Sequence, residues 1–252
     1  GRRRRRRTRQ AGRSVRDAGR YRGLVETADI RPVVRGADVD AFRYEVGGHL
    51  LWCHDHTTGP REPGPSTGRY LEDHRERLAR RTGYRDGHPL GVVFRLAPET
   101  LGPKVAWHDL SDTMRAVALP ACVRFDGHDR ELVPLNTVYF LPVPDQRVAL
   151  ALAGLLNSLP VRTMARAVAE RAKDARFRFF AWTVSTLPLP LGWETHRAVR
   201  AIEALSARCH QAGGINSGDQ HALDRAAAEL YGLPAGALEP LHAFHRWLTG
   251  TP

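Results

Sequence analysis

The stretch "DQRVALALAGLLNSLP" (145–160) is the most decisive for the fold. Its apolar residues cover most faces of a helix, which predicts a helix in the core and not on the surface. Asp145 is a suitable N-cap for that helix. Asn157, Ser158 and Pro160 end it, and we expect the two polar side chains to satisfy terminal carbonyls or the amides of the next helix. The stretch is therefore predicted to be scaffold and not an active site.

The sequence on either side of this helix predicts strands and further helices. Short β-branched and aromatic runs at 24–58 and 91–143, broken by glycine- and proline-rich turns, are typical of strands. Amphipathic patterns predict helices at 69–81, at 161–175 and three times after residue 191. The apolar run 176–191 predicts one more strand. Together these elements predict an α+β fold with a mixed β-sheet and packed helices.

The helices expected after residue 191 have clear signals. Apolar residues share one face of the first, namely Val199, Ile202, Leu205 and Cys209. The second is expected to start at a Ser217 cap and to end at Gly232. We therefore expect a small C-terminal helical subdomain over 191–252, after a sheet domain over 24–190.

The charge of the chain is concentrated at its beginning. The formal net charge is +11, and residues 1–22, the arginine tail, hold eleven of the 38 basic and one of the 27 acidic residues. Residues 23–252 therefore carry only +1. A block of like charges cannot bury apolar surface, so we expect a basic disordered tail over 1–23. It would bind phosphate backbones without sequence preference, or it marks the end of a fragment.

Length and composition indicate a globular protein. The 252 residues suffice for one large or two small domains, and no run approaches the ~18 apolar residues of a membrane span. The basic start lacks the apolar segment of a secretory signal. Cys53, Cys122 and Cys209 are far apart and odd in number, which indicates free thiols in the core of a protein from a reducing compartment. We expect a cytoplasmic protein with no membrane partner.

Residues that could carry catalysis are sparse. "WCHDH" (52–56) gathers Cys53, His54, Asp55 and His56, but neighbours in a strand face opposite ways and no second ligand pair has metal spacing. Nucleophile elbows and phosphate-binding glycine loops are absent from the sequence. The residues themselves therefore do not indicate an enzyme, and we assign no catalytic, cofactor-binding or metal-binding residue.

Arginines and aromatic residues coincide in two segments, "RERLARRTGYRDG" (75–87) and "RTMARAVAERAKDARFRFF" (162–180). On one helix, residues 162, 166 and 173 can share a face and form a basic stripe for phosphate contact. A solvated face offset by Glu170 and Asp174 is an equally good interpretation. The phenylalanines are expected in the core.

An ordered series of motifs resembles the C-terminal target-recognition region of TaqI-like adenine-N6 DNA methyltransferases, which fused methyltransferase-nucleases also carry. The motifs are "VETADIRPVVRGADV" (25–39), "YLEDHRERLARR" (70–81), "PKVAWHDLS" (103–111), "LNTVYFLPV" (135–143), "LAGLLNSLPV" (152–161) and "FRFFAWTVSTLPLP" (177–190). The resemblance covers roughly residues 24–190, and "ALDRAAAELYGLP" (222–234) is similar to the helix that often follows.

The resemblance implies a sequence-specific DNA-recognition module of a bacterial restriction-modification or phage-defence system. Its partners would be double-stranded DNA and a methyltransferase catalytic domain, in cis or in trans. The family's Asn-Pro-Pro-Tyr-type motif and S-adenosylmethionine loop do not occur in this sequence. S-adenosylmethionine is therefore expected in that catalytic domain, and we infer a recognition module separated from its catalytic half, or a partner that works beside one.

Several basic residues are candidates for DNA contact. Arg35 and Lys104 lie where the family tends to be basic or polar, and ion pairs to Asp38 or Asp109 are an equally open interpretation. The basic segments add Arg81, Arg85, Arg162 and Arg166. Two other functions stay open: the specificity subunit of a multi-subunit restriction system, and a metal-dependent hydrolase that uses Cys53, His54 and His56.

Overall fold

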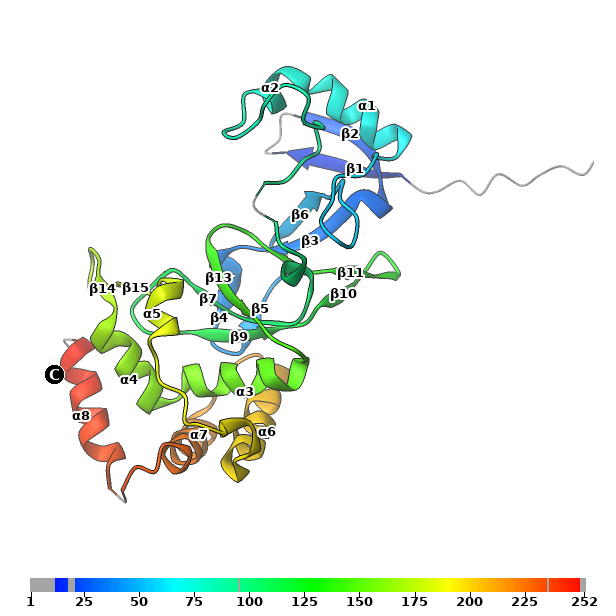
Figure 1. The fold of residues 1–252 in the computed structure, drawn as a ribbon. Coiled ribbons are helices and arrows are strands. Elements are labelled where there is room, and N and C mark those ends of the chain that lie inside the picture. Colours follow the sequence, from blue (N-terminus) through cyan, green and yellow to red (C-terminus); the bar gives the residue numbers. More distant parts are fainter. Residues whose placement is uncertain (1–11, 18–20, 95, 235, 250–252) are drawn as a thin grey trace, which may run out of the picture. The chain divides into compact units, whose positions relative to one another are not determined.

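The computed structural model describes residues 12–17, 21–94, 96–234 and 236–249, and Figure 1 shows their secondary structure. They form an α+β fold, which confirms the predicted class. The chain divides into two compact units, and each is considered by itself. Unit 1 takes the described residues of Gly1–Pro32, with His49–Pro98 and Arg124–Arg130. Unit 2 takes Val33–Gly48, Glu99–Val123 and the described residues of Glu131–Pro252.

Unit 1 starts with an antiparallel hairpin of β1 (Gly12–Asp17) and β2 (Tyr21–Glu26). The disordered tail expected over 1–23 is therefore wrong for these strands, while residues 1–11 and 18–20 lie outside the described residues. A β-ladder joins backbone groups, so it forms here in spite of the arginines. Val25 of β2 is fully buried, which adds an apolar contribution that the charge count does not show.

The strands β3 (Ile30–Val34) and β6 (Gly48–Leu51) are neighbours in one sheet and both cross the division between the units. The 3-10 turn η1 (Thr27–Asp29) joins β2 to β3. The helix expected at 69–81 is two helices, α1 (Pro65–Asp73) and α2 (Arg75–Ala79). The break falls at His74, whose backbone leaves the helical region at φ −115° and ψ 15°.

The core of unit 2 is built on the antiparallel sheet β13 (Val138–Pro142), β7 (Lys104–His108) and β9 (Ala116–Leu119). Side chains alternate between its two faces. Val105 and Trp107 belong to one apolar cluster, with α3 (Gln146–Asn157), and Ala106 belongs to the other. Both faces are buried, so β9 and the centre of β7, Val105–Trp107, are apolar without alternation.

Shorter elements complete the sheet region of unit 2. They are η2 (Gly36–Asp38), β4 (Val39–Asp40), β5 (Arg43–Tyr44), η3 (Pro98–Leu101), β8 (Leu110–Ser111), β10 (Cys122–Phe125), β11 (His128–Glu131) and β12 (Val133–Pro134). β12 pairs in parallel with Val33 and Val34 of β3, and β4 pairs with β5. β10 and β11 form a two-stranded sheet whose residues 124–130 count to unit 1.

Helix α3 has the expected start and a different end. The Asp145 side chain accepts hydrogen bonds from the amides of Arg147 and Val148, which confirms the N-cap. Ser158 Oγ donates to the carbonyl of Leu155 at 2.7 Å, as a residue closing the helix should. Asn157 does not serve the helix ends: its side chain pairs with the backbone of a strand, as described in the Discussion.

Helix α4 (Leu159–Val168) is shorter than the helix expected over 161–175. After it the chain forms β14 (Glu170–Arg171) and β15 (Phe177–Arg178), with a turn in which Asp174 and Ala175 have positive φ. The strand expected at 176–191 is also wrong beyond Arg178, because α5 (Ala181–Ser185) and the 3-10 turn η4 (Trp193–Thr195) follow. β15 pairs with β8, and that tertiary contact overrides the local helical pattern.

The C-terminal helices α6 (Arg197–Ala212), α7 (Ser217–Leu230) and α8 (Leu238–Thr249) are not a separate subdomain, because α6 packs on α3 within unit 2. Gly154 allows this contact, since a Cβ there would lie 2.6 Å from Ile202 Cγ2. The predicted apolar face of α6 is buried as expected. The N-cap of α7 is Asn216, whose side chain accepts from the Asp219 amide, and not Ser217.

No single helix of the described residues is long and apolar enough to cross a membrane, although the bent pair α3 and α4 passes that test on length and composition together.

Candidate nucleic-acid interface

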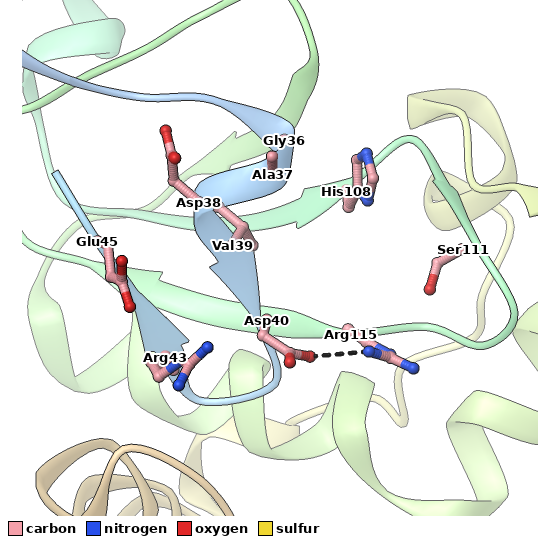
Figure 2. A pocket seen from close by; sticks show the side chains of 10 residues that line it. All are labelled: Gly36, Ala37, Asp38, Val39, Asp40, Arg43, Glu45, His108, Ser111 and Arg115. Carbon is pink, nitrogen blue, oxygen red and sulfur yellow. Dashed lines mark hydrogen bonds and ion pairs between the residues drawn. The ribbon is translucent and has the colours of Figure 1, made fainter. Parts of the chain in front are cut away.

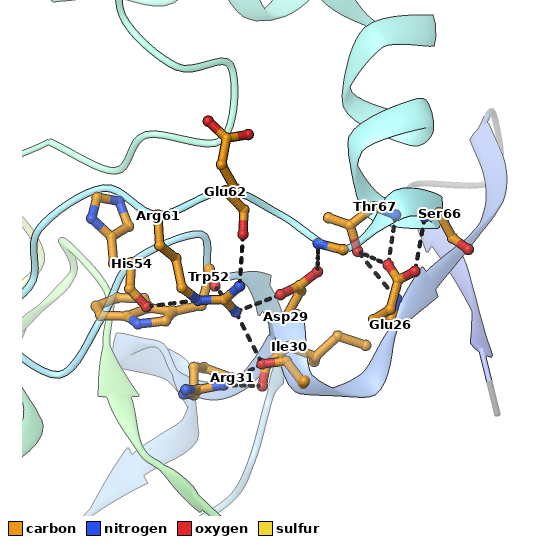
Figure 3. A network of polar contacts seen from close by, with 12 residues as sticks. Glu26, Asp29, Ile30, Arg31, Trp52, His54, Arg61, Glu62, Ser66 and Thr67 are labelled. Carbon is orange, nitrogen blue, oxygen red and sulfur yellow. Dashed lines mark hydrogen bonds and ion pairs between the residues drawn. The ribbon is translucent and has the colours of Figure 1, made fainter. Parts of the chain in front are cut away.

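A carboxylate from β2 holds the N-terminus of α1 in unit 1 (Figure 3). Glu26 accepts hydrogen bonds from the Ser66 amide at 2.8 Å, the Thr67 amide at 2.7 Å and Thr67 Oγ1 at 2.7 Å. Burial disfavours the charged form of Glu26, but these hydrogen bonds outweigh it and lower its pKa to about 2. A negative charge at a helix N-terminus is favourable, so Glu26 fixes where α1 begins.

The loop before α1 is held by a second carboxylate, that of the buried Asp29. Asp29 accepts from the Gly64 amide at 2.8 Å and forms an ion pair with Arg61. Arg61 also donates to the backbone carbonyls of Trp52 and His54 (Figure 3). The network ties the loop to the neighbouring strands, and it therefore positions α1, which the loop precedes.

Helices α1 and α2 form one wall of a pocket in unit 1 with a cavity volume of about 450 Å³, which we call the arginine pocket. Its apolar lining residues are Leu50, Leu51, Leu71, Leu78, Leu90, Gly91 and Val93. Its polar and aromatic lining residues are His49, Tyr70, His74, Arg77, Arg80 and Arg81. None of the described residues that line it is an aspartate or a glutamate. The pocket therefore combines a positive charge with an apolar floor.

The positive charge of Arg81 is held in the pocket wall by uncharged groups. Its guanidinium donates to the carbonyls of Leu78 at 3.0 Å, Leu90 at 2.6 Å and Val92 at 3.0 Å. Burial lowers the pKa of Arg81, and the described part of the chain gives it no carboxylate partner. Arginine stays charged in proteins, so this charge remains unneutralised next to the pocket.

Two more arginines of α2 and its end are at the surface. Arg77 and Arg80 are exposed and line the arginine pocket. The acidic residues nearby, Glu72, Asp73 and Glu76, line a neighbouring hollow together with His74, Arg75, Arg77 and Arg80. Arg75 is neutralised there by an ion pair with Glu72 at 2.6 Å. Arg77 and Arg80 thus border both hollows, and together with Arg81 and Arg85 they form what we call the basic side of α2.

The six predicted DNA-contact residues have different outcomes. Arg85 is exposed and Arg81 lines the arginine pocket, so both lie in unit 1 with the basic side of α2. Arg35 is exposed but forms the alternative ion pair, with Asp38, at 3.0 Å. Lys104 is completely buried and its Nζ lies 3.3 Å from the carbonyl of Leu132. Burial lowers the pKa of Lys104 to about 8, and a side chain so enclosed is a wrong prediction for DNA contact.

The predicted basic stripe on residues 162, 166 and 173 is wrong because α4 ends at Val168, before Lys173. Arg166 is 2% exposed and stacks over the Phe177 ring at 4.6 Å. Arg162 is partly buried, and burial lowers its pKa although Asp224 partly offsets this. Both guanidinium groups therefore belong to the packing of unit 2, and Phe177 is in the core as expected.

Unit 2 has a polar pocket of about 260 Å³, drawn in Figure 2. Its lining holds three carboxylates, Asp38, Asp40 and Glu45, and two arginines, Arg43 and Arg115. Arg115 pairs with Asp40 at 3.3 Å. A lining with more carboxylates than arginines is unfavourable for a phosphate. The arginine pocket is therefore the better candidate for an anionic ligand.

The "WCHDH" segment does not assemble metal ligands. His54 accepts from the Val93 amide at Nε2 and donates from Nδ1 to the Thr58 carbonyl, both at 2.8 Å. Burial raises the pKa of the Cys53 thiol to about 11, and Asp55 accepts from the amides of Thr57 and Gly59. Within the described ranges no three metal-binding side chains come together. These residues form a turn in which both ring nitrogens of His54 have backbone partners.

The cysteines of the described chain are all free thiols. Cys53 and Cys209 are buried as expected, but Cys122 is exposed. No family model matches the sequence, and no curated protein matches it either.

Proposed function

We propose that this protein is a DNA target-recognition module that acts with an adenine-N6 methyltransferase catalytic domain, in the same chain or in another. The resemblance described above suggests the enzyme class and S-adenosylmethionine as the cofactor of that domain. The observation that supports DNA as the partner is the basic side of α2, where exposed arginines surround a pocket with no described carboxylate in its lining.

This basic side suits the first task of a recognition module. Arginines contact phosphates and fix the register on the duplex, while base contacts provide sequence specificity. Arg77, Arg80 and Arg85 follow one another at the end of α2 and in the loop behind it, so they can follow a phosphate backbone. Residues 23–252 carry a net charge of only +1, so local separation of charges matters more than the total.

The test is selection from a randomised duplex pool at about physiological salt, where non-specific binding is weak. The protein is the full chain with Arg2–Arg7 and Arg9 replaced by serine, which removes seven of the tail's eleven arginines and leaves β1 intact. Enrichment of one short motif containing adenine would support the proposal. Loss of all DNA binding together with these seven arginines would overturn it.

A further inference from the structure

The arginine pocket has features that a phosphate-contacting surface does not need. Its volume of about 450 Å³ lies in the range of small-molecule sites, and six leucine and valine side chains line it. A phosphate of an intact duplex would touch the rim arginines and leave this apolar floor in contact with water. A ligand that fits the whole pocket therefore carries both an anionic group and an apolar, flat part.

Aromatic rings in the wall favour a planar group. Tyr70 lies on α1, and His74 is the residue directly after that helix, one helical turn later. Their ring centroids are 4.6 Å apart. His49 also lines the pocket, and its ring centroid lies 4.7 Å from that of Phe125. Bases stack on such side chains in proteins that bind single-stranded nucleic acid, and each stack contributes about 1–3 kcal/mol.

The arginines at the rim of the pocket suit the anionic part of such a ligand. Arg77 and Arg80 are exposed at the rim, where a phosphate can reach them while its base lies on the leucines. Arg81 adds a charge that no described carboxylate neutralises. Charge-assisted hydrogen bonds from arginine to phosphate are among the strongest in proteins.

We infer that the arginine pocket binds one nucleoside monophosphate group, with the base on the apolar floor and the phosphate at Arg77 and Arg80. The group has two possible sources: a free nucleotide, or an unpaired nucleotide of a DNA strand. A base stacked inside a duplex cannot enter, because its faces are covered by its neighbours. The second source rests on the proposed function and the first does not.

The experiment uses the full chain with Arg2–Arg7 and Arg9 replaced by serine. This protein is titrated separately with deoxyadenosine monophosphate, deoxyadenosine and inorganic phosphate. Calorimetry measures the affinity, and changes in the NMR chemical shifts of the backbone amides of residues 70–81 locate the ligand. We expect the monophosphate to bind at least tenfold more tightly than either part alone. Arg80→Gln should weaken it about tenfold, the loss of one charge-assisted hydrogen bond. Arg75→Gln, the matched control, should change it less than twofold because Arg75 pairs with Glu72 and does not line the arginine pocket.

A second arm distinguishes the sources and keeps the proposed function separate. Two duplexes carry the fluorescent base 2-aminopurine at the same position. In one duplex the labelled nucleotide is unpaired, and in the other it is matched. Preference for the unpaired duplex, lost in Arg80→Gln, would assign the site to DNA; binding of the free monophosphate alone would assign it to a free nucleotide. Equal affinity for phosphate and monophosphate, or no binding of either ligand, would overturn the inference. Matched duplexes could still bind in that case, and the proposed function would stand.

Discussion

The side chain of Asn157, the last residue of α3, binds both the backbone amide and the backbone carbonyl of Ala116 on β9. Its Oδ1 accepts from the Ala116 amide at 2.9 Å and its Nδ2 donates to the Ala116 carbonyl at 2.7 Å. β9 is at the edge of its three-stranded sheet, where backbone groups lack a neighbouring strand. The next outward amide, that of Ala118, donates to His210 Nε2 of α6 at 2.8 Å. Helix side chains thus close the open edge of the sheet.

Replacing Asn157 should therefore destabilise unit 2 strongly. Asn157→Ala leaves the buried Ala116 amide without its acceptor and removes one of the donors to its carbonyl. We expect a loss of about 2–4 kcal/mol in the free energy of unfolding, from unsatisfied polar groups plus a small cavity. Urea denaturation measures it, with exposed Ser185→Ala as the control; a loss below about 0.5 kcal/mol would contradict this role.

Lys104 gives a pH dependence that a single substitution removes. Its pKa falls from 10.5 to about 8 on folding, so the unfolded chain binds more protons between those values. Its charge therefore costs stability below pH 8, and this cost disappears as the pH rises toward 10.5. Lys104→Met should stabilise the protein at pH 7 by about 1–3 kcal/mol, because it removes an unpaired buried charge.

The measurement is the difference between wild type and Lys104→Met in unfolding free energy from pH 7 to 10. Taking the difference cancels the buried thiol of Cys53, which titrates in the same region. The gain should shrink as pH rises, and DNA affinity should not change. A gain in unfolding free energy that does not change with pH would contradict the lowered pKa of Lys104. Weaker DNA binding by Lys104→Met would show that Lys104 contacts DNA after all.

His245 on α8 predicts sensitivity to acid. Burial, with Arg162, Arg166 and His242 nearby, lowers its pKa from 6.5 to about 4, although Asp112 opposes this. A lowered pKa means that the unfolded chain takes up the proton first. The contribution of His245 is therefore fully present above pH 6.5 and is lost as the pH falls toward 4. Unfolding midpoints in urea across that window should fall, and His245→Gln should flatten the fall; an unchanged profile would refute the assignment.

Glu26 should matter locally for α1. Its pKa of about 2 lies below the usual 4.5, so its stabilisation is present above pH 4.5 and is lost as the pH falls toward 2. In Glu26→Gln the amides of Ser66 and Thr67 lose a charged acceptor. We expect faster hydrogen exchange at these amides and through α1, with exchange in α3 unchanged as the internal control. Equal exchange rates in α1 would show that the cap is not needed.

Arginines of the basic side should each change the salt dependence of DNA binding. Every phosphate contact contributes about 0.9 to the slope of log affinity against log salt. Arg80→Gln and Arg85→Gln should each lower the magnitude of that slope by about this amount. Arg197→Gln is the matched control, since Arg197 is 86% exposed and pairs with Glu229. An equal effect of the control would show general electrostatics instead of a defined surface.

Part of this candidate site could be predicted from the sequence. The density of arginines around Arg81 and Arg85 marks the segment. Nothing local marks the pocket, because its other walls come from 49–51 and 90–93, which only tertiary packing brings together. Arg80 and Arg81 show the same limit: they are adjacent and chemically identical, yet one is exposed and the other donates to three carbonyls.

The sequence by itself determined the α+β class, the buried helix with its Asp145 cap, and the inner face of α6, because all three depend on local propensity and periodicity. Only the tertiary structure decided what covers each face. Lys104 and Arg166 carry the same charge as Arg80, but the packing around β7 and α4 buries them. The same packing ends α4 early and pairs Asn157 with a strand, because contacts distant in sequence outweigh the small local preferences of single residues.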